Sequence, residues 1–292
     1  MIDAMRKNYK ITELCDALGV SPSGYHAAIK RPESRRTTEN ALLLEAMTSV
    51  HEHRHTRSYG SPRMTVELRD RGYRASENRV ARLMRRSGLR ARPRRPYRPK
   101  TTRPDHAAHP SPNLLAEVGP PVSPGAQLVS DITYIPTKEG WLYLAVVIDL
   151  FSRAILGWKI ADSLHSQIVT GALLNALRTG HIAAGAIFHS DRGCQYTASS
   201  TRDLLHKHGL LQSMSAAGYC YDNAFAESAF ASLKAELPDA EQPFPSKQAA
   251  RLAIFDYIET FYNRRRRHTS LGSISPFDYL QINFTTKNKN LN

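Results

Sequence analysis

The sequence predicts an α+β or α/β fold: a mixed five-stranded sheet flanked by helices and preceded by a basic helical region. Two observations predict it. Up to about residue 90, apolar residues recur at helical spacing, and residues 51–105 carry 17 Lys and Arg against 5 Asp and Glu. After residue 125, three short apolar runs follow one another closely, and two more alternate with helical stretches. That order is typical of a mixed sheet with helices on its faces.

The composition narrows the classes of function. The chain has 292 residues and a formal net charge of +14, which favours a polyanionic partner such as nucleic acid. Its three cysteines form no CxxC pair, which argues against a disulfide framework and a cysteine-based zinc site. The N-terminus lacks the apolar segment of a signal peptide, and the most apolar run, 142–150, is too short to span a bilayer. We therefore expect a cytoplasmic protein with no membrane partner.

Residues 1–37 are expected to form a small helical unit. Leu14 before Gly19 and Tyr25 after it stand at helical spacing, and Ser21 can cap the second helix. A helix, a glycine turn and a capped helix make the pattern of a helix-turn-helix, which a plain helical hairpin fits equally well.

Residues 38–100 are expected to form a basic helical region that binds DNA. Helices are predicted over 38–54, 64–71 and 76–87. The third should begin after Ser76 and end before Gly88, with its apolar residues facing inward. Its arginines suit a phosphate backbone, although a solvated face is the alternative. The candidate DNA-binding residues are Arg79, Arg82, Arg85 and Arg86, with Arg94 and Arg95 in the basic segment that follows.

Two other stretches lack a clear element or role. Residues 101–124 are rich in Pro, Ser and His and are expected to be a linker. Upstream, His51, His53 and His55 alternate. Alternate residues diverge on a helix, so we expect these side chains to face solvent or phosphate rather than a metal.

Residues 125–280 are expected to form the domain with the sheet, ending in a helix. The first three strands, joined by short turns, should form an antiparallel meander. Strands are predicted over 126–135, 141–150, 153–161, 185–191 and 210–215. Helices are predicted over 166–180, 198–209, 223–237 and 247–263. The last twelve residues, 281–292, are polar and expected to be disordered.

Three acidic residues stand on apolar elements. Asp131 lies inside the first strand, Asp191 ends the fourth, and Glu227 lies on a helix of mostly Ala, Phe and Ser. Such charges are costly unless they are paired or bound to a cation, and oxygen-only ligation suits Mg²⁺ or Mn²⁺. If the first and fourth strands pair, the two aspartates become neighbours. Asp222 can cap the helix of Glu227, and Lys234, seven residues further on, shares its face.

Each of these acids alone is more often structural, and a fourth one is expected to be so. Asp149 ends the second strand and should stabilise the following turn, paired with Arg153. The combination of the other three is what predicts chemistry: convergent carboxylates with two bound metals can activate a hydroxyl and stabilise a leaving oxygen.

Three segments around these acids carry a resemblance: "SDITYIPTKEGWLYLAVVIDLFSRAILGW", "HSDRGCQYTASS" and "YDNAFAESAFASLKAEL". They resemble the integrase catalytic core of bacterial insertion-sequence transposases of the OrfB type, in the DDE superfamily. The 35 residues between Asp191 and Glu227 agree with the family's spacing. Residues 59–92 resemble its helical DNA-binding segment, and "YNRRRRHTSLGSISPFDY" resembles its C-terminal motif. The resemblance extends over most of the chain.

The resemblance implies a ribonuclease-H-like fold and DNA transposition, in which DNA strands are cut and joined without a covalent enzyme–DNA bond. It implies that Asp131, Asp191 and Glu227 hold Mg²⁺ or Mn²⁺, as two ions, and that Lys234 lies near DNA. Residues implied to support the site are His189, Gly193, Gln195, Tyr196 and Asn223, in addition to Asp222. Residues implied to contact DNA are Arg264, Arg265, Arg266 and Arg267. The family also implies a homo-oligomer on DNA, at least a dimer, in the bacterial nucleoid. A fusion or partnership with an upstream-frame helix-turn-helix protein is a further expectation.

The sequence departs from the family pattern before "YDNA", where Ala216, Ala217 and Tyr219 change a usually polar stretch. This alters the expected DNA contacts and removes no metal ligand. Two alternative functions are a ribonuclease-H-like nuclease that cuts without joining, and a non-catalytic DNA-binding regulator derived from a transposase. The long basic helical front argues against the first, and the intact set of acids argues against the second.

Overall fold

A computed structural model describes residues 2–91, 111–215, 224–237 and 242–289. The chain forms two compact units that divide between Met47 and Thr48. The division therefore lies inside helix α4 (Arg35–Glu52), and so does residue 37, where the sequence predicts the boundary. Within the described ranges, none of the helices combines the length and the apolar character that crossing a bilayer requires.

The first unit is helical. Leu14 and Cys15 are buried in a small apolar cluster, Gly19 makes the turn with φ +64°, and the Ser21 hydroxyl accepts a 3.1 Å hydrogen bond from the N–H of Gly24. The two helices and the glycine turn that the sequence predicts are therefore confirmed. The helices ahead of α4 are α1 (Ile2–Met5), α2 (Ile11–Ala17) and α3 (Pro22–Lys30).

The second unit begins with the arginine-rich helical region that the sequence predicts. The Ser76 hydroxyl accepts a hydrogen bond from the N–H of Arg79 and so caps α6, and the apolar side chains of α6 are buried. This confirms the predicted start of that helix and its inward face. The elements are the end of α4, the short 3₁₀ helix η1 (Thr56–Ser58), α5 (Ser61–Asp70) and α6 (Glu77–Arg86).

A five-stranded sheet with the order β3-β2-β1-β4-β5 forms the centre of the second unit. As predicted, β1, β2 and β3 make an antiparallel meander, while β4 pairs parallel with β1 and β5 pairs parallel with β4. The sheet is therefore mixed, as the sequence predicts. The strands are β1 (Gln127–Thr137), β2 (Gly140–Asp149), β3 (Ile155–Ala161), β4 (Ile187–Ser190) and β5 (Leu211–Met214).

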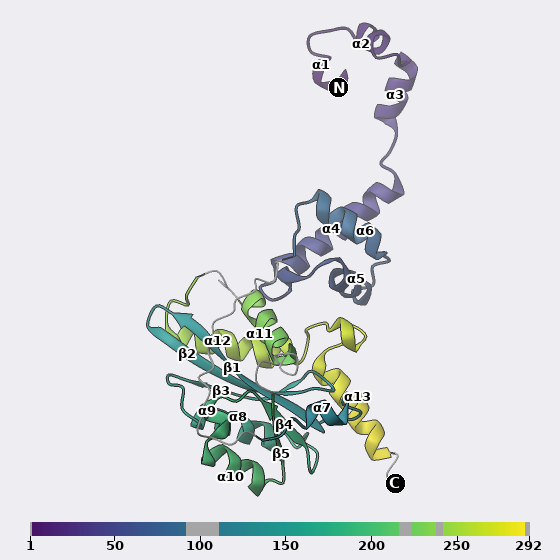
Figure 1. Ribbon diagram of the computed structural model, residues 1–292. Coiled ribbons are helices and arrows are strands. Elements are labelled where there is room, and N and C mark those ends of the chain that lie inside the picture. The colour runs from purple at the N-terminus through teal and green to yellow at the C-terminus, as the bar shows by residue number, and fades with distance from the viewer. Residues whose placement is uncertain (1, 92–110, 216–223, 238–241, 290–292) are drawn as a thin grey trace. The chain divides into compact units, whose positions relative to one another are not determined.

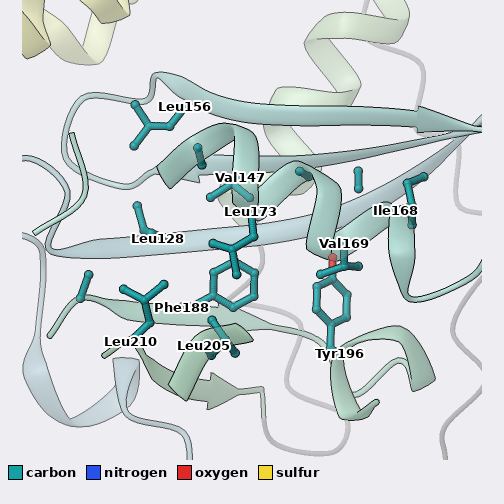
Figure 2. Packing of buried hydrophobic residues seen from close by; sticks show 14 of the residues in the cluster. Leu128, Val147, Leu156, Ile168, Val169, Leu173, Phe188, Tyr196, Leu205 and Leu210 are labelled. Carbon is teal, nitrogen blue, oxygen red and sulfur yellow. The ribbon is translucent and has the colours of Figure 1, made fainter. Parts of the chain in front are cut away.

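Helices cover both faces of the sheet (Figure 1). One face carries α8 (Gln167–Arg178), α9 (Cys194–Thr197) and α10 (Ser199–Lys207), and the other carries α11 (Ala224–Glu236) and α12 (Lys247–Phe255). Figure 2 shows the apolar core under the first group, where Leu128, Val147 and Phe188 of three strands meet Leu173 of α8 and Tyr196 of α9.

The close contact between β3 and α8 depends on a glycine. A Cβ at Gly157 would lie 2.3 Å from the carbonyl oxygen of Ala172 and 2.4 Å from the nitrogen of Ala176. Both are backbone atoms and cannot move aside as a flexible side chain could. The smallest residue therefore lets the helix backbone lie directly on the strand.

The segments outside this core differ in part from expectation. In the expected linker, residues 111–114 lie along β5, where the Pro112 carbonyl accepts from the Met214 N–H, and a short helix α7 (Leu115–Val118) follows. The predicted helix over 247–263 continues beyond α12 as a π-helical segment, η3 (Asp256–Tyr262).

The expectation of disorder over 281–292 is wrong for residues 281–289, since they continue helix α13 (Pro276–Lys289) after the short helix η4 (Thr269–Leu271). The Ser275 hydroxyl accepts from the N–H of Asp278 at the start of α13, and Leu280 is buried in the core. A capped start and an apolar anchor therefore support a helix whose remaining residues are mostly polar.

Candidate active site

Two of the predicted acids lie on neighbouring strands. Since β1 and β4 pair in parallel, with Val129 opposite His189, the register carried two residues further places Asp131 level with Asp191. Both side chains are half-buried at the end of this pairing. The strand pairing that the sequence argument required is therefore present.

The hydroxyl of Tyr196 lies close to both aspartates. Its side chain is fully buried, and its hydroxyl shares a 3.1 Å hydrogen bond with the Ser130 hydroxyl. Burial raises the pKa of Tyr196 well above its ordinary value, and the negative charges of Asp131 and Asp191 raise it further. The Tyr196 hydroxyl is therefore within electrostatic reach of both carboxylates, in agreement with the strand register that brings the two acids together.

The loop after β4 holds the carboxylate of Asp191. The N–H of Gly193 donates a 3.0 Å hydrogen bond to its Oδ1, and a Cβ at Gly193 would lie only 3.0 Å from the same oxygen. The Gln195 side chain donates to the carbonyl of Leu164, which ties the next turn to the start of α8. Gly193 and Gln195 thus shape the loop around Asp191.

His189 is buried beneath this loop and is not one of the residues beside the two carboxylates. Its imidazole is fully buried, with Nδ1 2.8 Å from the Ser213 hydroxyl and Nε2 3.0 Å from the Ser215 hydroxyl. Arg192, in turn, donates from Nε to the carbonyl of Ser215. These bonds join the ends of β4 and β5, so His189 supports the backbone that carries Asp191.

Helix α11 turns its Lys234 face toward the first aspartate. Burial lowers the pKa of Lys234, and the charge of Asp131 acts in the opposite direction, so the ammonium lies near that carboxylate. Ser130 and Asp131, adjacent on a strand, face opposite sides of the sheet, which places Tyr196 on one side and α11 on the other. Glu227, seven residues before Lys234, shares that helix face and is exposed.

The structure does not bring all three acids to one point. Among residues 2–91, 111–215, 224–237 and 242–289, no three His, Cys, Asp or Glu side chains are close enough together to hold a metal ion. Asp131 and Asp191 converge, and Glu227 lies on the facing helix without completing the set. The remaining predicted supports, Asp222 and Asn223, lie outside the described residues.

Sequence comparisons identify the family of this chain. Residues 121–220 match an integrase core domain family, 208–276 match a second one, and 38–97 match an HTH-like domain family. Transposase InsF for insertion sequence IS3A, from Escherichia coli (strain K12), is 39% identical over 296 residues, which cover 99% of this chain and 98% of that protein. The chain belongs to the IS3-family transposases. It is a DNA transposase of the DDE polynucleotidyl transferase class, with the ribonuclease-H-like fold.

Two further similarities accompany this one. The insertion element IS600 uncharacterized 31 kDa protein of Shigella sonnei is 39% identical over 265 residues, which cover 90% of this chain and 96% of that protein. A solved structure of the HTLV-2 integrase catalytic core domain in complex with magnesium, in its trimeric form, aligns with a TM-score of 0.42 and 14% identity. The alignment covers 54% of this chain and 97% of that chain.

The arginines after η3 in this transposase do not form one DNA-binding surface. Arg266 is 2% exposed and its guanidinium bonds to Glu236, so the prediction that it contacts DNA is wrong. Arg267 is largely buried and ion-paired with Glu67 and Asp70 of α5. The Arg266 guanidinium, held by a carboxylate inside the protein, is not available to a phosphate, whereas the partners of Arg267 lie nearer the surface. Arg264 and Arg265 are exposed.

The arginines of α6 are arranged as the sequence predicts. The side chains of Arg82, Arg85 and Arg86 are exposed and that of Arg79 is half-buried. Opposite them, the apolar residues of the helix are buried. The face of α6 that carries these charges is therefore free of the apolar core. The candidates Arg94 and Arg95 lie outside the described residues.

Two expectations about structural residues have different outcomes. Asp149 stabilises the turn after β2, as predicted. Its carboxylate accepts hydrogen bonds from the N–H and hydroxyl of Ser152 and the N–H of Gly125, while Arg153 donates its backbone N–H to the Asp149 carbonyl. The expectation that His55 faces solvent or phosphate is wrong. It is buried, stacks on Phe261 and lies 2.6 Å from an oxygen of Asp256.

Some residues of the site could not be identified from the sequence. Ser130, Ser213 and Ser215 bond to Tyr196 and His189, yet a serine in a strand is an ordinary residue. The alternation of Ser213 and Ser215 is the one signal that could have indicated them, because alternate residues of a strand face the same side. Glu236, the last residue of α11, is also missed by the pattern of acids on apolar strands.

Proposed function

We propose that this transposase cuts DNA at the ends of its element and joins those ends to a target, using Asp131, Asp191 and Glu227. The observation that carries the proposal is the convergence of Asp131 and Asp191 around the Tyr196 hydroxyl. Lys234 of α11 lies within electrostatic reach of Asp131, and Glu227 shares the helix face of Lys234. Glu227 would complete the set from α11 when DNA is bound.

The donor set fits Mg²⁺ or Mn²⁺. Carboxylate oxygens are the ligands these cations prefer, and two half-buried carboxylates side by side repel each other unless a cation lies between them. When bound, two such ions would supply Lewis-acid stabilisation to the oxygens of an in-line displacement at phosphorus. Asp131 and Asp191 would hold them from the sheet, with Glu227 as the ligand from the helix.

The chain's own residues would organise the reaction. Gly193 and Gln195 fix the Asp191 loop, and the Lys234 ammonium would approach a phosphate of the scissile strand. A water or 3′-hydroxyl oxygen would form the new bond to phosphorus while the bond to the leaving 3′-oxygen breaks. No side chain would become covalently attached to DNA.

The partners proposed for the chain follow from the same function. The exposed arginines of α6, with Arg264 and Arg265, would contact the phosphate backbone of the element ends and the target. Joining two ends requires at least a dimer on DNA, and an upstream-frame helix-turn-helix protein would be a fusion partner or a separate one. We place this assembly at the bacterial nucleoid.

The proposal is tested with pre-cut element ends, a target plasmid and Mg²⁺ in a strand-transfer assay. Asp191→Asn should abolish joining and leave end binding intact, because one ligand is lost and the DNA-binding surface is not touched. Asp203→Asn, which makes the same change at an exposed position on α10, is the control and should join ends like the wild type. Wild-type protein that cuts without joining would favour the nuclease, and joining that survives Asp191→Asn would overturn the assignment.

A further inference from the structure

Glu236 lies at the centre of a buried ionic cluster outside the carboxylate site. It is 4% exposed, and each of its oxygens accepts two hydrogen bonds. Arg266 donates to both oxygens, from Nε at 2.7 Å and from Nη2 at 2.8 Å. The Tyr257 hydroxyl donates at 2.8 Å, and Arg63 donates from Nη1 at 3.3 Å. Four donor atoms from three separate segments therefore converge on one carboxylate.

The Glu236 carboxylate is ionised and faces two guanidinium groups. Burial alone would raise the pKa of Glu236, but the charge and hydrogen bonds of Arg266 outweigh burial and leave the pKa lowered. Two-point contact between a guanidinium and a carboxylate also fixes their relative orientation, because both groups are planar. Such a contact holds the end of α11 in direction as well as in position.

The donors come from different parts of the transposase. Arg63 lies on α5, within the part of the chain that matches the HTH-like domain family. Arg266 follows η3, and Tyr257 lies inside it. Glu236 ends α11, nine residues after Glu227 and two after Lys234. One carboxylate thus connects the helical DNA-binding region to the helix that carries the third acid.

A small rotation at this cluster would be amplified at the other end of the helix. With a rise of 1.5 Å per residue, Glu227 lies about 13 Å along α11 from Glu236, so a tilt of about 4° would displace it by about 1 Å. Misplacement of a reacting group by about 1 Å can cost about 100-fold in rate.

We infer that Glu236 is a positioning residue: its contacts with Arg266 and Arg63 together set the direction of α11, and the contact with Arg63 couples the helical DNA-binding region to the placement of Glu227. The inference rests on the proposed role of Glu227. Arg63 is the component to change, because Arg266 and Tyr257 still satisfy Glu236 when Arg63 is absent and the fold is retained.

The test compares Arg63→Met with Arg63→Lys and with Arg71→Met. Methionine keeps the apolar stem and removes the charge, whereas lysine restores a cation that can reach Glu236. Arg71→Met is the matched control, since Arg71 directly follows the same helix and forms a more exposed ion pair with Glu67. Strand transfer is measured at saturating element-end DNA to give kcat, and end binding is measured separately to give Kd.

Arg63→Met should lower kcat about tenfold or more without changing Kd, Arg63→Lys should recover most of the rate, and Arg71→Met should match the wild type. A loss of affinity with unchanged kcat would show that Arg63 contacts DNA and overturn the inference. Equal kcat values for Arg63→Met and Arg71→Met would also overturn the inference. In that case the proposed function would still stand, provided that the wild-type protein joins ends and Asp191→Asn does not. Wild-type protein that fails to join ends would overturn both.

Discussion

Replacing Arg266 with methionine should destabilise the second unit strongly. The change leaves Glu236, which is 4% exposed, with only the Tyr257 hydroxyl and the single 3.3 Å contact from Arg63. Removing one partner of a buried ion pair costs about 3–5 kcal/mol, because the other charge stays buried. A domain is stable by about 5–15 kcal/mol in total, so this one change should remove a large share of the margin.

Urea unfolding followed by circular dichroism measures this loss as a lower midpoint at unchanged slope. Arg265→Met is the control: the neighbouring side chain is exposed, and its loss should shift stability by less than about 0.5 kcal/mol. The double variant Glu236→Gln with Arg266→Met removes both charges and keeps an acceptor for Tyr257, so it should be more stable than Arg266→Met alone. Equal midpoints for Arg266→Met and Arg265→Met would refute the reasoning, as would a double variant less stable than the single one.

Three further outcomes are expected. Gly157→Ala should destabilise by about 1–3 kcal/mol in urea unfolding because its Cβ would meet the backbone of α8, whereas Gly171→Ala, which meets only the flexible Lys159 side chain, should be neutral or stabilising. Burial lowers the pKa of His55 from 6.5, so below pH 6.5 the unfolded chain binds a proton that the folded chain does not, and the free energy of unfolding should fall as the pH drops. His55→Gln should flatten this dependence of the unfolding free energy on pH, and an unchanged dependence would contradict the prediction. Chelation with EDTA should stop strand transfer while end binding persists, and added Mg²⁺ should restore joining; transfer in EDTA would exclude the proposed metal dependence.

The sheet could be predicted from the sequence because its signals are local. Short turns such as the one between Thr137 and Gly140 join the first three strands, and such turns allow only antiparallel neighbours. The helices between the later strands permit parallel pairing, and the pairing of the first and fourth strands is the condition under which the sequence places Asp191 beside Asp131. The capped start of α6 at Ser76 was equally local, since the serine and its N–H partner are three residues apart.

The roles of Arg266 and His55 could not be predicted, because their partners lie far along the chain. Glu236 is 30 residues before Arg266, and Asp256 is 201 residues after His55. In the sequence, a run of arginines or of alternating histidines indicates exposed charge, which is the usual case. Only the tertiary fold brings a carboxylate to each of them and so gives the buried polar side chain a partner.

The three acids also differ in what positions them: strand pairing holds two of them, and contacts from distant segments hold the helix of the third. This difference explains why two converge and the third does not. Asp131 and Asp191 are held by strand register, which backbone hydrogen bonds fix. Glu227 depends instead on the direction of α11, and the last residue of that helix is held by side chains of α5 and of the segment after η3. The placement of the third acid is thus tied to the region that would bind DNA. If these acids are the catalytic set we propose, it would be complete only when that region and the helix are held together, so joining should respond to changes in either.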